Sequence, residues 1–172
     1  MSITPDTKDW TWVLQRPCPE CGYDASNVSP SDVPRRLGAC AHAWVDVLGR
    51  EDARARPAPT VWSPLEYGCH VRDVCRLYLE RLELMLATDD PLYPNWDQDA
   101  TAVADRYGEQ DPITVAEQLA GAATQLALRF AALTEAEWQR PGRRSDGAAF
   151  TVDSFARYFL HDVEHHLHDV RS

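Results

Sequence analysis

The sequence predicts an all-α protein, a four-helix bundle with up-down or up-down-down-up topology. Four stretches place apolar residues at helical spacing, segments rich in proline and charge separate them, and no segment shows convincing strand alternation. Long helices with one apolar face each bury that face by packing together, which is the architecture of a bundle. The 172 residues suit one domain with a sizeable hydrophobic core.

The first two helices are expected over residues 34–48 and 63–87. The apolar face of the first is formed by Leu37, Cys40, Ala41, Trp44, Val47 and Leu48. The second begins with a strong helix-start signal, because Ser63 can cap it, Pro64 fits its first position and Glu66 stands where a capping-box carboxylate belongs. The inward seam of the second helix is expected to comprise Tyr67, His70, Val74, Leu77 and Leu84.

The third helix is expected to begin at Asp111-Pro112, a cap followed by proline, and to end near residue 133. The fourth begins near Thr151 and continues almost to the last residue. The connecting segments, residues 50–62, 88–110 and 134–150, are long for a minimal bundle. Long loops often build the mouth of a site.

The chain is expected to divide into an N-terminal arm, residues 1–29, and the bundle proper, residues 30–172. Trp10 and Trp12 are expected to anchor the arm to the bundle. The net charge of −10 argues against nucleic acid and anionic membranes as partners, because both are recognised by basic patches. A small-molecule substrate is the expected partner, and the protein is expected to be a monomer or a homodimer.

The five cysteines are expected to be free thiols, since an odd count without a visible secretion signal does not suggest a disulfide framework. The N-terminus lacks the basic and apolar regions of a signal peptide, and no apolar run is long enough for a membrane span. The expected location is the cytoplasm. Cys18 and Cys21 are spaced like half of a zinc knuckle, but no second cysteine pair follows, so an incidental or structural role is expected.

Four of the six histidines lie close together near the C-terminus, at His161, His165, His166 and His168. Imidazole is a common ligand for zinc, nickel, copper and iron. Two ligands on one helix must share a face, which requires a spacing of three or four residues. Two such pairs compete: His161 with His165, and Asp162 with His166.

Helical periodicity favours the second pair. Stepping by four and three from Phe155 along the apolar face reaches Phe159, Asp162 and His166. His161 lies more than about 90° from the centre of that face, so the His161/His165 seam is expected to point away from the bundle. Asp162 and His166 are therefore the favoured metal ligands, and His161 and His165 are the alternative register.

The second helix supplies the complement, because the same periodicity places His70 on its inward face. An inward Asp162 needs a partner, since an unpaired buried charge costs several kcal/mol. A metal held by His70, Asp162 and His166 would satisfy all three, whereas the alternative is a polar layer in which carboxylates pair with histidines. Two histidines and one carboxylate leave coordination positions open, as in catalytic sites.

Two motifs resemble the DinB-like superfamily, which includes the mycothiol-dependent maleylpyruvate isomerases and related thiol S-transferases. They are WSPLEYGCHVRDV at residues 62–74, with His70 followed by Asp73, and HDVEHHLHDV at residues 161–170, with Asp162, His166 and the trailing Asp169-Val170. The segment at 133–152 also resembles the loop before the family's last helix, and the likeness spans about residues 30–171.

The resemblance implies a DinB-like four-helix bundle that holds a divalent metal. Zinc is expected, with nickel, iron or manganese as alternatives, and a low-molecular-weight thiol such as mycothiol as co-substrate. The implied activity is transfer of the thiol to an electrophilic small molecule, or a thiol-dependent isomerisation. A bundle that binds a metal or a small molecule without catalysis is the alternative.

Two loop segments have open interpretations. Residues 94–99 combine Trp96 with polar side chains and are expected to pack on the bundle, with a site mouth as the alternative. Arg140, Arg143 and Arg144 form a basic cluster that is expected to be solvated, with contact to an anionic substrate as the alternative.

Overall fold

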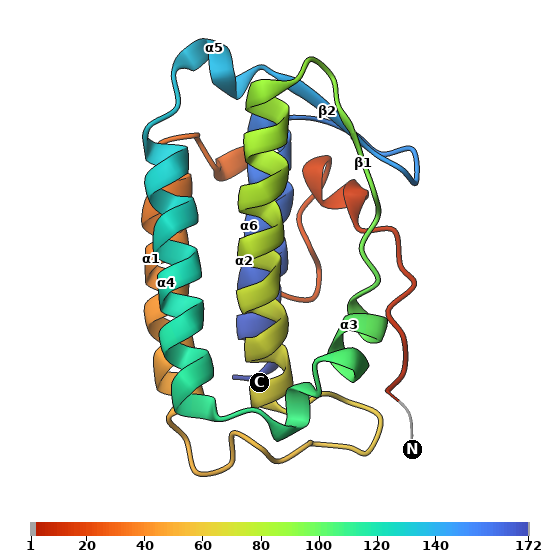
Figure 1. The fold of residues 1–172 in the computed structure, drawn as a ribbon, viewed down its shortest axis with the longest axis vertical. Coiled ribbons are helices and arrows are strands. Elements are labelled where there is room, and N and C mark those ends of the chain that lie inside the picture. The colour runs from red at the N-terminus through yellow and green to blue at the C-terminus, as the bar shows by residue number, and fades with distance from the viewer. Residues whose placement is uncertain (1–2, 172) are drawn as a thin grey trace.

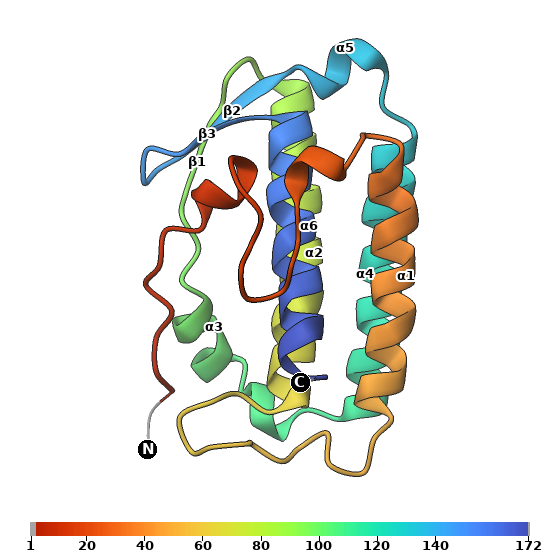
Figure 2. The ribbon, with the colours of Figure 1, turned by 180° about the vertical axis from the view of Figure 1, so that it is seen from behind.

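Four long helices run side by side in the computed structural model, which describes residues 3–171 (Figure 1). They are α1 (Asp32–Leu48), α2 (Pro64–Ala87), α4 (Pro112–Ala131) and α6 (Val152–Asp169). The chain descends along α1, ascends along α2 and again along α4, and descends along α6 (Figures 1 and 2). The predicted four-helix bundle is therefore confirmed, and its topology is up-down-down-up.

The core lies between these helices, because α4 packs against both α1 and α2, and α6 packs against the same two helices. Each helix contributes its apolar stripe, so the interior is lined by aromatic and aliphatic side chains. The largest fully buried side chains of the four long helices are Trp44, Phe130, Phe155, Phe159, Leu37, Leu48, Leu65, Leu82, Met85, Leu119 and Leu126.

One detail of the predicted seam of α2 is wrong. Leu84 was expected to face inward, but it is 37% exposed, and Tyr78, Leu82 and Met85 are buried instead. An α-helix has 3.6 residues per turn, so a seam read in steps averaging 3.5 drifts around the helix over its 24 residues. His70, near the start of α2, is not affected by this drift and is buried.

The start of α2 is fixed by a complete capping box. The Ser63 hydroxyl accepts a hydrogen bond from the Glu66 amide at 3.2 Å, and the Glu66 carboxylate accepts one from the Ser63 amide at 2.8 Å. Glu66 also forms an ion pair with Arg56 of the preceding loop. These bonds hold the first turn of the helix that carries His70.

Replacing Ser63 by alanine is expected to lower the free energy of unfolding by about 1 kcal/mol, the usual cost of a lost side-chain cap. For a domain of this size the melting temperature should fall by about 2–4 °C, measured by circular dichroism. Ser31→Ala is the matched control, because Ser31 precedes α1 without making a side-chain cap hydrogen bond. An equal loss in both variants would contradict the role of the Ser63 cap.

The connecting segments contain a small sheet, which the sequence did not predict. β1 (Leu92–Tyr93) pairs in parallel with β2 (Pro141–Arg144), and β2 pairs antiparallel with β3 (Ala149–Thr151). Strands of two to four residues are too short to show alternation, and β1 and β2 are far apart in sequence. The same segments hold the short helices α3 (Gln98–Ala104), η3 (Tyr107–Glu109) and α5 (Glu135–Trp138).

The N-terminal segment before α1 crosses the outer face of α6 (Figure 2). It includes two short 3-10 helices, η1 (Thr11–Leu14) and η2 (Ala25–Asn27), and both contact α6. Trp10 and Trp12 pack against the core cluster, and the Tyr23 hydroxyl donates a hydrogen bond of 2.7 Å to the Arg157 carbonyl oxygen. We call residues 3–29 the arm; it covers a face of α6 that would otherwise be open.

No helix within residues 3–171 combines the length and the apolar character needed to cross a membrane.

Candidate metal centre

His70 on α2 meets Asp162 and His166 on α6. The His70 Nε2 atom lies 3.5 Å from Asp162 Oδ2, and the His166 Nε2 atom lies 3.5 Å from Asp162 Oδ1. One ligand atom from each residue lies within 4.8 Å of the other two. First-row metals bind such atoms at about 2.0–2.2 Å, which places neighbouring ligand atoms roughly 3 Å apart. The three ligand atoms would therefore have to move slightly closer together to coordinate one cation. Metal binding at these residues stays a prediction.

The neighbours of the two imidazoles hold them in place. The His166 Nδ1 atom lies 3.2 Å from Asp169 Oδ2, so this carboxylate orients the ring with its Nε2 toward Asp162. A carboxylate on the second nitrogen is the usual partner of a metal-binding histidine. The His70 ring stacks on Trp96 with the ring centroids 5.4 Å apart, and Trp62 contacts it at a similar distance.

Several buried polar atoms of this group have no hydrogen-bond partner in the part of the chain that the structure describes. Both ring nitrogens of His70 and the Oδ2 atom of Asp162 are buried without a hydrogen-bond partner among the described residues. A buried polar atom left without a partner costs about 1–3 kcal/mol, so such atoms are rare in folded proteins. A divalent cation coordinated by His70, Asp162 and His166 would satisfy the His70 Nε2 and Asp162 Oδ2 atoms, whereas the His70 Nδ1 atom would need a separate partner.

The pKa values put two of the three residues, His70 and Asp162, in the form that binds a metal. Burial lowers the pKa of His70, which is 1% exposed, so its ring is neutral and has a lone pair to offer. Burial would raise the pKa of Asp162, but His166 and His70 hold it well below its usual range, so the carboxylate is ionised. Burial would lower the pKa of His166, but Asp162 and Asp169 raise it to about 9, so its ring is protonated near neutral pH and a metal would have to displace that proton.

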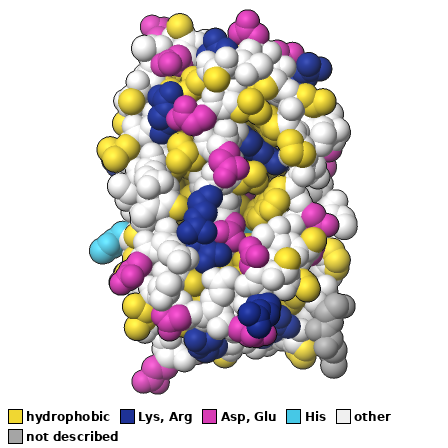
Figure 3. Space-filling model, viewed as in Figure 1, with side chains coloured by type: hydrophobic (Ala, Val, Ile, Leu, Met, Phe, Trp, Pro, Cys, Tyr) yellow, Lys and Arg dark blue, Asp and Glu magenta, His cyan; other side chains and the backbone are white. Residues whose placement is uncertain are grey.

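The group borders a cavity of about 1070 Å³. Its walls come from α2, α6, the segment 95–100, the β2–β3 hairpin and residues 5–11 of the arm. Two arginines, Arg81 and Arg144, line it together with aromatic side chains such as Tyr78 and Trp96. Figure 3 shows a hollow in the face seen in Figure 1, with hydrophobic and basic side chains visible in it. The group therefore lies where a small molecule has room to bind.

The two loop segments with open interpretations both reach this cavity. Trp96 stacks on His70, so residues 95–99 line the cavity as well as packing on the bundle. Of the basic cluster, Arg144 lines the cavity and pairs with Asp146, whereas Arg140 pairs with Asp89. The expectation of a fully solvated cluster is therefore wrong for Arg144.

Asp73, the acidic residue three positions after His70, contacts Tyr107 and Arg72 and is not part of the three-ligand group. Its carboxylate accepts a hydrogen bond of 2.6 Å from the Tyr107 hydroxyl and pairs with Arg72 at 2.8 Å. Tyr107 belongs to η3, so Asp73 ties the connection before α4 to the helix that carries His70. The residue thus supports the position of α2.

His161 and His165 lie on the side of α6 that faces away from the bundle, as the helical wheel predicted. They are on the outer side of α6, but they are only 3% and 6% exposed, because the arm covers them. Each ring contacts Trp10, with ring centroids 5.3 and 5.0 Å apart. Burial lowers the pKa of His161 to about 4 and also lowers that of His165, so both rings are neutral.

The arm brings Cys18 and Cys21 to these two histidines, and the four residues form a second group of metal-ligating side chains. The described residues contain no second cysteine pair near Cys18 and Cys21, but they do place two histidines beside them. The spacings C-x2-C and H-x3-H, which are those of Cys₂His₂ zinc sites, were the sequence signal that could have paired these residues. The pairs are distant in sequence, and nothing local predicts that the arm lies over α6.

The sequence matches the DinB superfamily over residues 36–170. Among solved structures, the fold is similar to that of YfiT from Bacillus subtilis, described as a probable metal-dependent hydrolase with an unusual four-helix bundle topology. That match has a TM-score of 0.71 and 17% identity, and it covers 83% of this chain and 86% of the other. No curated protein matches the sequence.

Proposed function

Since this chain belongs to the DinB superfamily, we propose that it is a metal-dependent thiol S-transferase or thiol-dependent isomerase that uses His70, Asp162 and His166 as ligands. The observation that carries the proposal is the three-ligand group at the wall of a cavity of about 1070 Å³. Two imidazoles and one carboxylate leave open positions, which suits a catalytic cation better than a structural one. Zinc is the favoured metal, with nickel, iron and manganese as alternatives.

When bound there, a divalent cation lowers the pKa of a coordinated thiol, so that the thiolate nucleophile forms near neutral pH. Asp162 contributes the negative charge that favours a cation at this point. Asp169 fixes His166, and Trp96 and Trp62 fix His70, so the ligand geometry does not have to form during the reaction. Side chains of the arm and of residues 95–100 line the open side of the cavity beside these ligands.

The electrophile is proposed to be anionic, because two guanidinium groups line the cavity. Arg81 is buried and donates a hydrogen bond of 2.8 Å to the Pro94 carbonyl oxygen, and it has no carboxylate partner within 4 Å in residues 3–171. Arg144 pairs with Asp146, and the Tyr158 hydroxyl is 3.4 Å away. Arginine binds carboxylates in a bidentate manner, so Arg81 is the favoured anchor for a carboxylate on the electrophile.

A calorimetric titration with mycothiol tests the proposal. Mycothiol is expected to bind the metal-loaded protein, because its thiol needs the cation. Treatment of the protein with a chelator should abolish this binding. S-methylated mycothiol is the matched control ligand, since it keeps the rest of the molecule and blocks the sulfur. Equal binding with and without metal, or equal binding of the methylated ligand, would argue against a metal–thiol interaction.

Hydrolysis is the second candidate, because the solved structure with a similar fold is described as a probable metal-dependent hydrolase. The two candidates differ in their need for a thiol. Turnover of an electrophile only with added thiol supports transfer or isomerisation, whereas metal-dependent turnover without thiol supports hydrolysis. Metal binding with neither activity would support the non-catalytic alternative, a bundle that holds a metal or a small molecule.

A further inference from the structure

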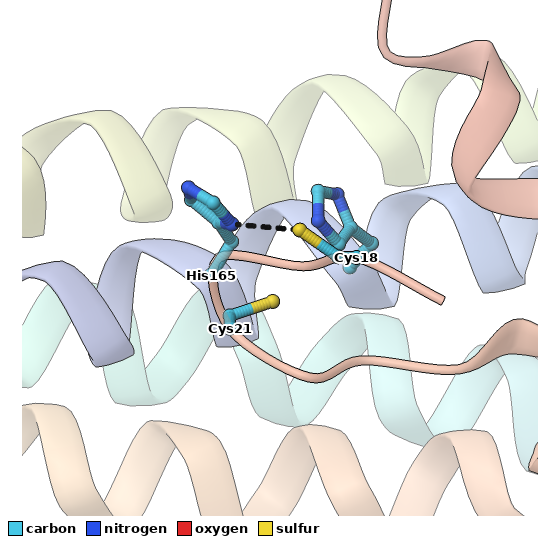
Figure 4. A group of neighbouring side chains, drawn as sticks. Cys18, Cys21 and His165 are labelled. Atoms are coloured by element: carbon cyan, nitrogen blue, oxygen red, sulfur yellow. Dashed lines mark hydrogen bonds between the residues drawn. The ribbon is translucent and has the colours of Figure 1, made fainter. Parts of the chain in front are cut away.

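The arm forms a tight turn at Cys18-Pro-Glu-Cys21-Gly22. The Gly22 amide donates a hydrogen bond of 2.8 Å to the Cys18 carbonyl oxygen, and the Cys18 amide donates one of 2.8 Å to the Tyr23 carbonyl oxygen. Gly22 adopts a φ of +76°, a conformation that glycine accepts without strain. Figure 4 shows the Cys18 sulfur directed toward the ring of His165 on α6, with the Cys21 side chain beside it.

The four ligand atoms of this group are already close. The Cys18 sulfur lies 3.8 Å from the His165 Nδ1 atom (Figure 4), and one atom from each of Cys18, Cys21, His161 and His165 lies within 4.8 Å of the others. Tetrahedral Zn²⁺ with sulfur at about 2.3 Å and nitrogen at about 2.0–2.1 Å places its ligand atoms roughly 3.3–3.8 Å apart. The group is therefore close to the size that zinc requires.

We propose that Cys18, Cys21, His161 and His165 form a second metal site, a closed Cys₂His₂ site for Zn²⁺ that fastens the arm to α6. Its four protein ligands leave no open position, which is typical of structural zinc and differs from the three-ligand group at His70. The spacing of the ligands, two residues between the cysteines and three between the histidines, is that of known zinc sites. This proposal does not depend on the proposed thiol chemistry.

The surroundings of the histidines support the site independently. The Nε2 atom of His161 is buried and has no hydrogen-bond partner among the residues described. The Nδ1 atom of His165 faces Cys18, and its Nε2 atom lies 3.5 Å from Glu20 and 3.7 Å from Asp169. Carboxylates on the far nitrogen are the usual outer partners of a zinc-binding histidine.

A metal at this site would link the arm to the cavity. The arm residue Trp10 contacts both His161 and His165 and also lines the cavity beside His70. Asp169 lies between the two groups, because it is 3.2 Å from His166 and 3.7 Å from His165. Binding of zinc by the four ligands would stabilise the arm in its position, since the energy of metal binding adds to that of folding.

Cobalt titration of the reduced, metal-free full-length protein tests the proposal. Cobalt bound by thiolates gives an intense charge-transfer absorption in the near ultraviolet, which histidine and carboxylate ligands do not give. This absorption is expected to saturate at one equivalent of Co²⁺ per chain and to disappear when Zn²⁺ is added. Absence of the absorption in wild-type protein would overturn the proposal.

Variants assign the ligands. Cys18→Ser and His165→Gln are expected to lose the thiolate absorption, or to weaken Co²⁺ binding at this site by roughly a hundredfold. Cys40→Ala is the matched control, because Cys40 is a buried cysteine of α1 outside the group. His70→Ala is expected to keep the thiolate absorption, because His70 is not a ligand of the Cys₂His₂ site. The proposal for the three-ligand group and the proposal for this site can therefore be rejected independently. Retention of the full absorption in Cys18→Ser would overturn the proposal.

A measurement on the wild-type protein covers the case in which a variant does not fold. Amide hydrogen exchange of residues 18–23 should slow by at least about tenfold when Zn²⁺ is added to the metal-free protein, because the site would oppose opening of the arm. Amides in the middle of α4, which no proposed ligand contacts, are the internal reference. Equal exchange of residues 18–23 with and without Zn²⁺ would overturn the proposed role in holding the arm.

Discussion

Replacing His70 by alanine is expected to weaken metal binding at the three-ligand group by at least about a hundredfold. Loss of an outer partner of a ligand already costs about 10–100-fold in metal affinity, and loss of a ligand should cost more. The remaining pair, Asp162 and His166, lies on one helix and cannot surround a cation. Elemental analysis after dialysis should show one metal fewer per chain than in wild-type protein, and metal-dependent thiol binding should disappear.

The control for this variant is His42→Ala, because His42 is an exposed histidine on α1. Circular dichroism should show that His70→Ala keeps the helical content of the wild type. His166→Ala should lose the same metal, since it removes a second ligand of the same group. If His70→Ala and His166→Ala both kept the metal content and affinity of the wild type, the three-ligand assignment would be wrong. The metal would then belong to the group that includes His161 and His165.

Replacing Phe159 by alanine is expected to lower the free energy of unfolding by about 3–5 kcal/mol. Phe159 is 0% exposed, and its ring centroid is 4.9 Å from that of Tyr78 and 6.3 Å from that of Phe130. The substitution removes these contacts and leaves a cavity between α2, α4 and α6. Taking about 2–4 °C per kcal/mol, the melting temperature should fall by roughly 6–20 °C.

Denaturant unfolding of Phe159→Ala, followed by circular dichroism, measures this loss. Phe159→Leu keeps most of the volume and should cost about 1.5 kcal/mol or less. Leu128→Ala, at an exposed position of α4, should stay within about 0.5 kcal/mol of wild type. A loss below about 1 kcal/mol in Phe159→Ala would contradict a central role of this ring in the core.

The helices and their starts were predictable because they depend on neighbours in sequence. The capping box of Ser63 and Glu66 spans four residues, and the apolar stripes repeat within each helix. The same local periodicity selected Asp162 and His166 over His161 and His165 as the residues that face His70. Over the 24 residues of α2 the periodic reading became less accurate, which is why Leu84 was misplaced.

The sheet and the arm depend on contacts between distant segments. β1 and β2 pair across the whole of α4, and neither strand carries a pattern that identifies its partner. The helical wheel predicted the direction of His161 and His165, but it describes one helix and not the segment that covers it. Burial of His161 and His165 follows from the path of the arm (Figure 2).

The sequence by itself determined four amphipathic helices, their caps, and the face on which His70, Asp162 and His166 lie, since each of these follows from spacing along one helix. Only the tertiary structure decided which loops form the cavity, which arginine enters it, and that Cys18 and Cys21 meet His161 and His165. The physical reason is that side-chain periodicity fixes direction within a helix, whereas the meeting of distant segments depends on how the whole chain packs.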